Sequence, residues 1–217
     1  MIGALVPAKA LDQAKGRLAA LLSEDERRQL ALAMLTDVLN ALQAVPSLDT
    51  IAVVSPDSDV LEHARSSGAG AIQEPQTVRG INQALSHALH SPIVRGIDTL
   101  VVVLADVPEI TPADVQQVID AVPFPRGIVI CPSRDKGTSI LAARPPSVIP
   151  FRFGPLSFSA HKREAAAQGL EAQVLHIETL AADIDSPADL QNLLSRPAET
   201  ATQRLLARLG VAARAGG

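Results

Sequence analysis

The stretch Thr99–Leu104, which reads T-L-V-V-V-L, is the feature that most constrains the fold of this chain. A run of β-branched and aliphatic residues is typical of a strand buried on both faces at the centre of a parallel sheet. The run ends just before Asp106, and ligands of open α/β sheets bind outside the carboxyl ends of the strands. A carboxylate there can hold a metal ion and, through it, phosphate oxygens. The alternative is that Asp106 only caps the following turn.

The rest of the chain alternates short apolar runs with amphipathic segments. The apolar runs predict strands at residues 2–7, 50–55, 71–73, 99–104, 127–131, 139–143 and 173–177. Capping signals and helical periodicity predict helices that begin near residues 23, 57, 80, 111, 159, 186 and 202. This alternation predicts an α/β fold with a mostly parallel central sheet and helices on both faces.

Length and composition exclude several classes of protein. A chain of 217 residues fits one domain, predicted at residues 1–195, followed by a partly helical C-terminal tail at residues 196–217. The net charge of −4 and the scarcity of aromatic residues argue against nucleic-acid binding. The single cysteine, Cys131, excludes an internal disulfide. No apolar segment approaches the ~20 residues that span a bilayer, so we expect a cytoplasmic protein with no membrane partner.

Three cations, Lys9, Lys15 and Arg17, follow the first predicted strand. Arginine offers a forked donor and lysine a mobile point charge, so together they can surround a polyphosphate. The alternative is an ordinary solvated loop. The spacing is not that of a P-loop, and the glycine fingerprint of dinucleotide-binding folds is absent, which disfavours a dinucleotide-dependent dehydrogenase.

Three further polar clusters fall at predicted strand ends or in loops. Gly80 and Asn82 stand at a helix start, where backbone N–H groups suit an anion and an Asn side chain can pair with a base or a ribose hydroxyl. A polar loop at residues 132–139 lies between two apolar strands, and such loops often carry function. Asp183 and Asp185 precede a helix; if that segment is extended, they point to opposite faces and only one of them reaches the site directly.

Separated acids, Asp106 and Asp183, together with the early cations, predict a metal–triphosphate site. Phosphoryl or nucleotidyl transfer depends mainly on positioning and on charge neutralisation by Mg²⁺, lysine and arginine. From the residues alone we therefore predict an α/β nucleotide-handling enzyme with Mg²⁺ as its cofactor.

Several motifs also occur in a characteristic order between about residue 3 and residue 194. They read P-A-K-A-L-D-Q-A-K-G-R-L-A, S-E-D-E-R-R-Q-L-A-L-A-M-L-T-D-V-L, G-I-N-Q-A-L, L-A-D-V-P, P-S-R-D-K-G-T-S-I-L, F-G-P-L-S-F-S-A-H and D-I-D-S-P-A-D-L. In this order and spacing they resemble the 2-phospho-L-lactate or phosphoenolpyruvate guanylyltransferases of deazaflavin cofactor (coenzyme F-420) biosynthesis. The family loop usually reads D-G-G-T-N, whereas this chain has Lys136 and Ser139 at two of those places.

The resemblance implies a single-domain nucleotidyltransferase fold of the glycosyltransferase-A type. It implies that a small phosphorylated three-carbon acid attacks the α-phosphate of GTP and that pyrophosphate leaves. It also implies a role for each matching residue of this chain. Asp106, Asp183 and Asp185 are then the Mg²⁺ residues, and Lys9, Lys15 and Arg17 contact the triphosphate. Thr138, Gly154 and Ser157 cradle the acid, with His161 nearby, and Gly80 and Asn82 lie on the guanosine side.

Three functions stay open at this point. The first is guanylyl transfer to the phosphorylated acid, and the second is nucleotidyl transfer to another acceptor, such as a sugar phosphate or a molybdopterin-type cofactor. The third is a nucleotide-binding module without catalysis. Among the acids we expect phosphoenolpyruvate before 2-phospho-L-lactate, because the Ala- and Leu-rich composition looks bacterial and bacterial members of the family are associated with phosphoenolpyruvate. The partners expected are therefore GTP and this acid, and a homodimer is an open alternative to a monomer.

Overall fold

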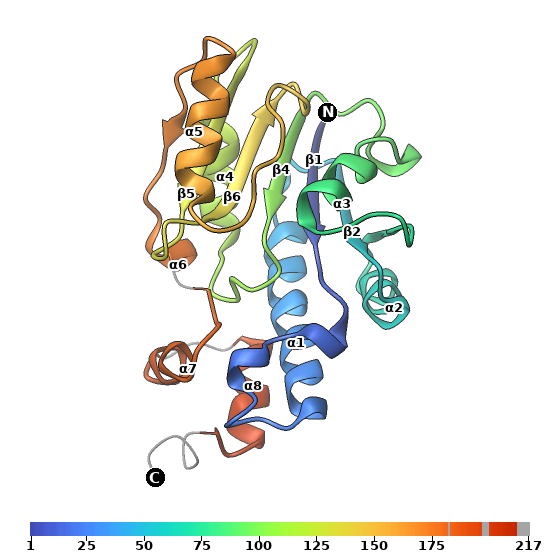
Figure 1. Ribbon diagram of the computed structural model, residues 1–217, viewed down its shortest axis with the longest axis vertical. Coiled ribbons are helices and arrows are strands. Elements are labelled where there is room, and N and C mark those ends of the chain that lie inside the picture. The colour runs from blue at the N-terminus through green and yellow to red at the C-terminus, as the bar shows by residue number, and fades with distance from the viewer. Residues whose placement is uncertain (182, 197–199, 212–217) are drawn as a thin grey trace.

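A seven-stranded sheet forms the centre of the molecule (Figure 1). The computed structural model describes residues 1–181, 183–196 and 200–211. The strand order is β3-β2-β1-β4-β6-β5-β7. The strands are β1 (Ile2–Pro7), β2 (Thr50–Ser55), β3 (Gly70–Gln73), β4 (Thr99–Val103), β5 (Gly127–Pro132), β6 (Thr138–Arg144) and β7 (Gln173–Val174).

Most strand pairs are parallel, as the sequence predicted. β1 pairs in parallel with β2 and β4, and the pairs β2–β3 and β5–β7 are also parallel. Only β6 runs the other way, antiparallel to both β4 and β5. The connection from β5 to β6 therefore lies at the same edge of the sheet as the carboxyl ends of β1, β2 and β4. That edge collects the predicted polar loops.

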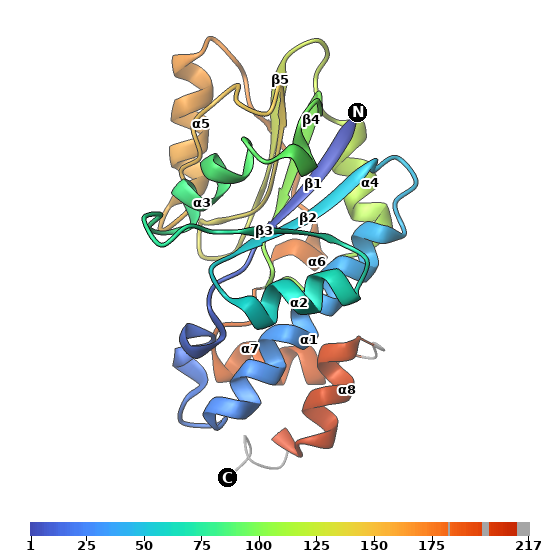
Figure 2. The same cartoon turned by 90° about the vertical axis from the view of Figure 1, so that its right-hand side faces the viewer.

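Helices cover both faces of the sheet, as Figure 2 shows. Side chains alternate between the faces along a strand. In β1, Ala4 and Val6 join a core cluster with α1, α2 and α4, while Leu5 joins a second cluster with α3 and α5. The helices are α1 (Glu24–Gln43), α2 (Ser58–Ser66), α3 (Ile81–Ala88), α4 (Pro112–Asp120), α5 (Ser157–Ala167), α6 (Glu178–Ala181), α7 (Pro187–Leu194) and α8 (Ala201–Arg208).

A third apolar cluster lies away from the sheet, where α7 and α8 pack beside the N-terminal half of α1 (Figure 1). Leu206 of α8 and Leu30 of α1 are fully buried in it. Asp37 of α1 also accepts hydrogen bonds from the backbone N–H groups of Ala201 and Thr202, at 2.6 and 2.9 Å, which satisfies the start of α8. The predicted boundary at residue 195 stays a prediction, and residues 212–217 of the predicted tail lie outside the described residues.

The predicted elements differ from the observed ones mainly at their ends. α5 begins at Ser157 rather than Ser159, after Leu156 in a left-handed conformation. The late strand ends at Val174 instead of residue 177, and the short helix α6 follows it. Three 3-10 turns also occur, η1 (Leu11–Gln13), η2 (Gly16–Leu18) and η3 (Pro92–Val94). Among the helices of the described residues, none combines the length and apolar character that a membrane crossing requires.

Candidate active site

A cleft of about 500 Å³ opens at the carboxyl ends of β1, β2, β3 and β4. It is lined by every site residue predicted from the sequence except Arg17, Asn82 and His161. Those that line it are Lys9, Lys15, Gly80, Asp106, Thr138, Gly154, Ser157, Asp183 and Asp185. The fold thus gathers residues that lie up to about 175 positions apart in the chain, which is the position that open α/β sheets use for ligands.

Three carboxylates meet on one side of the cleft. Asp106 follows β4, whereas Asp183 and Asp185 precede α7, and one oxygen of each lies within 4.8 Å of the others. The backbone N–H of Ile184 donates to the carbonyl of Asp106 at 3.3 Å, which joins the two segments. The expectation that only one of Asp183 and Asp185 reaches the site is wrong. The segment is not part of a strand, so the two-residue alternation does not apply to it.

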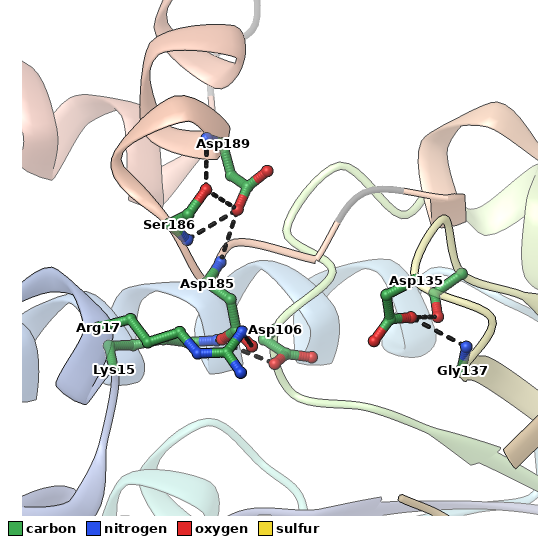
Figure 3. A network of polar contacts seen from close by, with 9 residues as sticks. Lys15, Arg17, Asp106, Asp135, Gly137, Asp185, Ser186 and Asp189 are labelled. Atoms are coloured by element: carbon green, nitrogen blue, oxygen red, sulfur yellow. Dashed lines mark hydrogen bonds and ion pairs between the residues drawn. The ribbon is translucent and has the colours of Figure 1, made fainter. Parts of the chain in front are cut away.

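Lys15 links two of these carboxylates, as Figure 3 shows. Its ammonium donates to Asp106 Oδ2 at 2.9 Å and to Asp185 Oδ1 at 2.8 Å. The Lys15 side chain is only 8% exposed. Burial lowers the pKa of Lys15, but the charges of Asp106 and Asp185 outweigh burial and leave that pKa above its ordinary value. Lys15 is therefore a buried, permanently charged cation in the cleft.

The other two predicted cations are more exposed. The Arg17 side chain is 81% exposed, and its guanidinium lies 3.9 Å from Asp185 Oδ2, a pair that water screens. Lys9 is exposed at the rim, where its charge contributes to lowering the pKa of Asp185. Contact of Lys9 and Arg17 with a phosphate stays a prediction.

The loop that carries these cations is held by its local sequence. Asp57, at the end of β2, accepts a hydrogen bond from the N–H of Leu11 at 2.8 Å. Leu18, one residue after Arg17, is fully buried in the third apolar cluster. Lys15 itself has a left-handed backbone with φ 50°, which turns the chain into η2. The loop is thus anchored at both ends, and Lys15 points into the cleft.

The carboxylate cluster fits a divalent cation. Oδ1 of Asp106 is buried and has no hydrogen-bond partner among the described residues. Burial, together with the charges of Asp106 and Asp185, raises the pKa of Asp183 to about 6. The pKa of Asp185 lies below its ordinary value, because the Lys15 charge overcomes the effect of burial. An orphaned carboxylate oxygen beside two further carboxylates offers the oxygen ligands that Mg²⁺ prefers.

A second group of polar residues lies across the cleft. Thr138 begins β6, Ser157 begins α5, and His161 is one helical turn further along α5. The Ser157 hydroxyl donates to Thr138 Oγ1 at 3.2 Å, and Thr138 Oγ1 lies 3.1 Å from His161 Nδ1. Burial lowers the pKa of His161 to about 4. Gly154 lines the same side with φ 131°, a conformation that favours glycine.

The sequence predicted Asn82 on the guanosine side of the site, whereas in the structure its side chain bonds to the protein backbone. Its side-chain amide donates to the carbonyl of Phe153 at 2.9 Å and accepts from the N–H of Phe153 at 2.7 Å. Asn82 thus ties the start of α3 to the loop before Gly154. Gly80 precedes α3 with φ 78° and lines the cleft. Contact of Gly80 and Asn82 with a nucleotide stays a prediction.

The loop between β5 and β6 carries Lys136, and Ser139 follows it in β6; these are the two departures from the family pattern. Lys136 has φ 68°, a left-handed conformation in which glycine is usual. Asp135 accepts hydrogen bonds from Ser133 and from the N–H of Gly137, which closes the loop (Figure 3). The Ser139 hydroxyl donates to the carbonyl of Leu180 at 2.6 Å and so supports the segment before Asp183. Ser139 therefore serves the carboxylate side of the cleft.

Sequence reasoning missed Glu74, which lines the cleft directly after β3. Its carboxylate has no hydrogen-bond partner in the part of the chain that the structure describes, and burial raises its pKa. It lies on the side of Gly80 and Ile81. The rule that singled out Asp106, an acid just after a strand, also fits Glu74. The strand before it is only Gly70–Gln73, too short to draw attention.

The chain matches known proteins over nearly all of its length. The family model described as "Guanylyl transferase CofC like" matches residues 2–215. A phosphoenolpyruvate guanylyltransferase of Sphaerobacter thermophilus is 45% identical over 191 residues, which cover 88% of this chain and 91% of that relative. A 2-phospho-L-lactate guanylyltransferase of Methanothermobacter thermautotrophicus is 34% identical over 206 residues, which cover 95% of this chain and 90% of that relative.

A solved structure shares the fold. The crystal structure of a putative nucleotide-diphospho-sugar transferase from Desulfovibrio desulfuricans G20 superposes with a TM-score of 0.78 at 18% identity. The match covers 99% of this chain and 96% of that chain. The predicted nucleotidyltransferase-like fold is therefore confirmed.

Proposed function

This chain belongs to the CofC-like guanylyl transferase family and is a guanylyltransferase, and from that premise we propose that it joins GMP from GTP to a phosphorylated three-carbon acid in deazaflavin cofactor biosynthesis. One observation carries the proposal. The Asp106 cluster with Lys15 and the Thr138 group with Gly154 line one cleft, which supports binding of a triphosphate beside a small acid. The choice of a phosphorylated three-carbon acid follows the names of the relatives, which act on phosphoenolpyruvate or 2-phospho-L-lactate.

The reaction needs little covalent help from the protein. A phosphate oxygen of the acid attacks the α-phosphorus of GTP, the bond to the β-phosphate oxygen breaks, and pyrophosphate leaves. A phosphomonoester is mostly dianionic at pH 7, so no side chain has to remove a proton from the nucleophile. The catalytic task is positioning and charge neutralisation.

We assign that task to the carboxylate side of the cleft. Lys15, Lys9 and Arg17 would neutralise the triphosphate and the departing pyrophosphate. The ion that fits Asp106, Asp183 and Asp185 is Mg²⁺, which when bound supplies positive charge to the phosphate oxygens. The buried, unpartnered Oδ1 of Asp106 supports this assignment.

The acid would bind on the other side of the cleft, between Thr138, Gly154 and Ser157. The hydroxyl groups of Thr138 and Ser157 can donate hydrogen bonds to the oxygens of such an anion. Phosphoenolpyruvate is our first choice and 2-phospho-L-lactate the second.

The nucleoside then takes the remaining part of the cleft, at the ends of β2 and β3 and the start of α3. Guanine presents an N1–H and an exocyclic amine on one edge, and a carboxylate accepts from both. Glu74, whose carboxylate accepts no hydrogen bond among the described residues and has the charges of His87 and Arg79 nearby, lies at that end. We propose that Glu74 pairs with guanine and that Gly80 lets the backbone approach the nucleoside.

The experiment is direct. The purified protein is incubated with GTP, Mg²⁺ and one acceptor at a time: phosphoenolpyruvate, 2-phospho-L-lactate, 3-phosphoglycerate or a hexose 1-phosphate. Pyrophosphate release and product mass are measured. We expect release with phosphoenolpyruvate and a product that joins GMP to it. Release with the hexose phosphate alone would contradict the acid class, and a clear excess of the lactyl product in competition would overturn the preferred acid.

Three further expectations accompany the reaction. A homodimer, a cytoplasmic location and the division of the chain at residue 195 all stay predictions. The described part of the tail supports a single functional unit, because α8 packs against α1 in the third apolar cluster.

A further inference from the structure

A buried chain of hydrogen bonds runs from the backbone to the acid side of the cleft. The N–H of Arg152 donates to His161 Nε2 at 3.0 Å. His161 Nδ1 lies 3.1 Å from Thr138 Oγ1, which accepts from Ser157 Oγ at 3.2 Å. Thr138 and Ser157 line the cleft, whereas His161 is 0% exposed behind them.

The first bond of this chain fixes the position of the imidazole proton. A nitrogen that accepts an N–H hydrogen bond carries a lone pair, so Nε2 of His161 is unprotonated. Burial lowers the pKa of His161 to about 4, with Glu164 and Arg152 as the charged groups that act on it, so the ring is neutral at pH 7. A neutral imidazole with a bare Nε2 carries its proton on Nδ1. The rings of His161 and Phe153 form a T-shaped contact with their centroids 4.8 Å apart, which helps to hold the orientation of the imidazole.

The number of donor protons on His161, Thr138 and Ser157 determines whether one of them is free to point into the cleft. The His161 Nδ1–H, the Thr138 hydroxyl and the Ser157 hydroxyl hold three protons between them, one on each group. The contacts between the three groups number two and consume two of these protons. One hydroxyl proton is left, and it has no acceptor among the described residues. With the other tautomer, both hydroxyl protons would be consumed internally and none would be left.

We propose that His161 is a positioning residue that makes the Thr138–Ser157 pair an obligatory hydrogen-bond donor toward an oxyanion of the phosphorylated acid. The inference rests on the proposed function for the identity of the anion, but not for the direction of the hydrogen bonds. His161 donates to Thr138, Thr138 or Ser157 then presents its proton to the cleft, and no lone pair of His161 faces the substrate.

The same residue also holds the neighbouring loop. The bond from Arg152 to His161 and the bonds from Phe153 to Asn82 fix the backbone just before Gly154. The N–H of Gly154 has no acceptor in the described part of the chain. The hydroxyl proton and this N–H are therefore two donors on one side of the cleft, a pattern that suits an anion with no proton of its own.

The first test reads the tautomer directly in the full-length protein without substrate. Long-range ¹H–¹⁵N NMR of the ¹⁵N-labelled protein distinguishes a protonated from an unprotonated ring nitrogen, and the His161→Asn variant assigns the signal. We expect a neutral His161 ring at pH 7 with the proton on Nδ1. A proton on Nε2, or a charged ring, would overturn the proposal whatever the substrate is.

The second test uses two variants that each keep one half of the imidazole. In His161→Asn the amide N–H₂ replaces Nδ1 and can still donate to Thr138; in His161→Gln the amide oxygen replaces Nε2 and can still accept from Arg152. We expect His161→Gln to raise the KM for the acid by about tenfold, the effect of one lost hydrogen bond. His161→Asn should recover most of that loss, with the Kd for GTP unchanged in both variants.

The exposed His176, changed to Gln, is the matched control and should leave the KM unchanged. Equal KM values for His161→Asn and His161→Gln would mean that His161 acts only through packing. If wild-type protein released no pyrophosphate with any acid, the proposed function would fail, yet the NMR test would still decide the direction of the hydrogen bonds.

Discussion

The residues around the cleft come from two parts of the fold, the sheet side and the helical side, a division by supporting structure that is distinct from the division into the carboxylate group and the acid-binding group. The sheet side carries Asp106 and Thr138, each next to a strand whose residues are almost all buried. The helical side carries Lys15, Asp183 and Asp185, which lie in segments without strand pairing. Leu18 and Ile184, close to these residues in the chain, anchor the helical side in the third apolar cluster with α7 and α8.

Because of this difference, the polar cluster spans the boundary between the sheet side and the helical side. Lys15 of the helical side bonds to Asp106 of the sheet side and to Asp185 of its own side. The cluster therefore forms only when the two sides are held in register. The sheet fixes half of the site, and packing of the C-terminal helices on α1 fixes the other half.

The largest effect should come from removing one carboxylate of either side. Asp106→Asn and Asp183→Asn should each reduce turnover by about a hundredfold to a thousandfold, because loss of a metal ligand removes several kcal/mol of transition-state stabilisation. Pyrophosphate release at saturating Mg²⁺ is the measurement. Asp120→Asn, an exposed acid of α4, is the control. Near-normal turnover of either variant would remove that residue from the metal site.

The same division decides what the sequence could predict. Asp106 was found by a local rule, an acid after an all-apolar strand, and the structure puts it at the end of β4. The helical side has no such rule. Asp183 was grouped with Asp106 as an acid just before a helix, and Asp185 was added to the metal site by resemblance. The expectation that only one of these two acids reaches the site was wrong, because the bond from Ile184 to Asp106, which joins residues far apart in sequence, helps to set the path of that segment.

Other features could not be predicted from the sequence, because they also depend on contacts between residues far apart in the chain. The antiparallel β6 follows from a long-range pairing with β4 that no local pattern encodes. The bond between Asn82 and Phe153 joins residues far apart in the chain, so spacing could not reveal it. The helix starts at Ser23, Thr111 and Ser186 were easier to predict, because each depends on four consecutive residues, and all three prove to be capping boxes.

The same leucine-to-alanine substitution, made once on each side, tests the comparison next. Leu206 in the third cluster and Leu100 in β4 are each fully buried. Changing either to Ala should lower the free energy of unfolding by about 2–5 kcal/mol, measured by urea denaturation. Only Leu206→Ala should also raise the KM for GTP, because it loosens the cluster that anchors Leu18 and Ile184. Equal KM values for both variants would mean that the tail does not support the site.

Base selection should respond to Glu74, at the nucleoside end of the cleft. Glu74→Gln keeps the shape but offers only one acceptor, so the preference for GTP over ITP, which lacks the exocyclic amine, should fall by about ten- to a hundredfold in kcat/KM. The neighbouring exposed Gln76→Ala is the control. A thermal-shift series should show the largest rise with GTP for the wild type. Equal shifts with ATP would contradict guanine as the base.

A smaller effect is expected from the acid group of the sheet side. Thr138→Val keeps the shape of the side chain but removes the hydroxyl, at a cost of about 1–2 kcal/mol for a lost hydrogen bond. The KM for the acid should rise by roughly five- to thirtyfold, while GTP binding, measured by calorimetry, stays unchanged. A parallel loss of GTP affinity would show that the two sides cannot be separated in this way.

The smallest effect is a pH dependence of stability that belongs to His161 on the sheet side. In the folded protein burial lowers the pKa of His161 to about 4, against 6.5 for an unperturbed histidine. The unfolded chain therefore binds the proton first, and stability falls as the pH falls through 6.5 toward 4. Between pH 7.5 and 6.0 the loss should be about 1 kcal/mol. It is measured as the difference between wild type and His161→Asn in urea denaturation at both pH values, since the variant cancels the contributions of all other groups. Identical pH dependence in the two proteins would show that burial in the folded protein does not lower the pKa of His161.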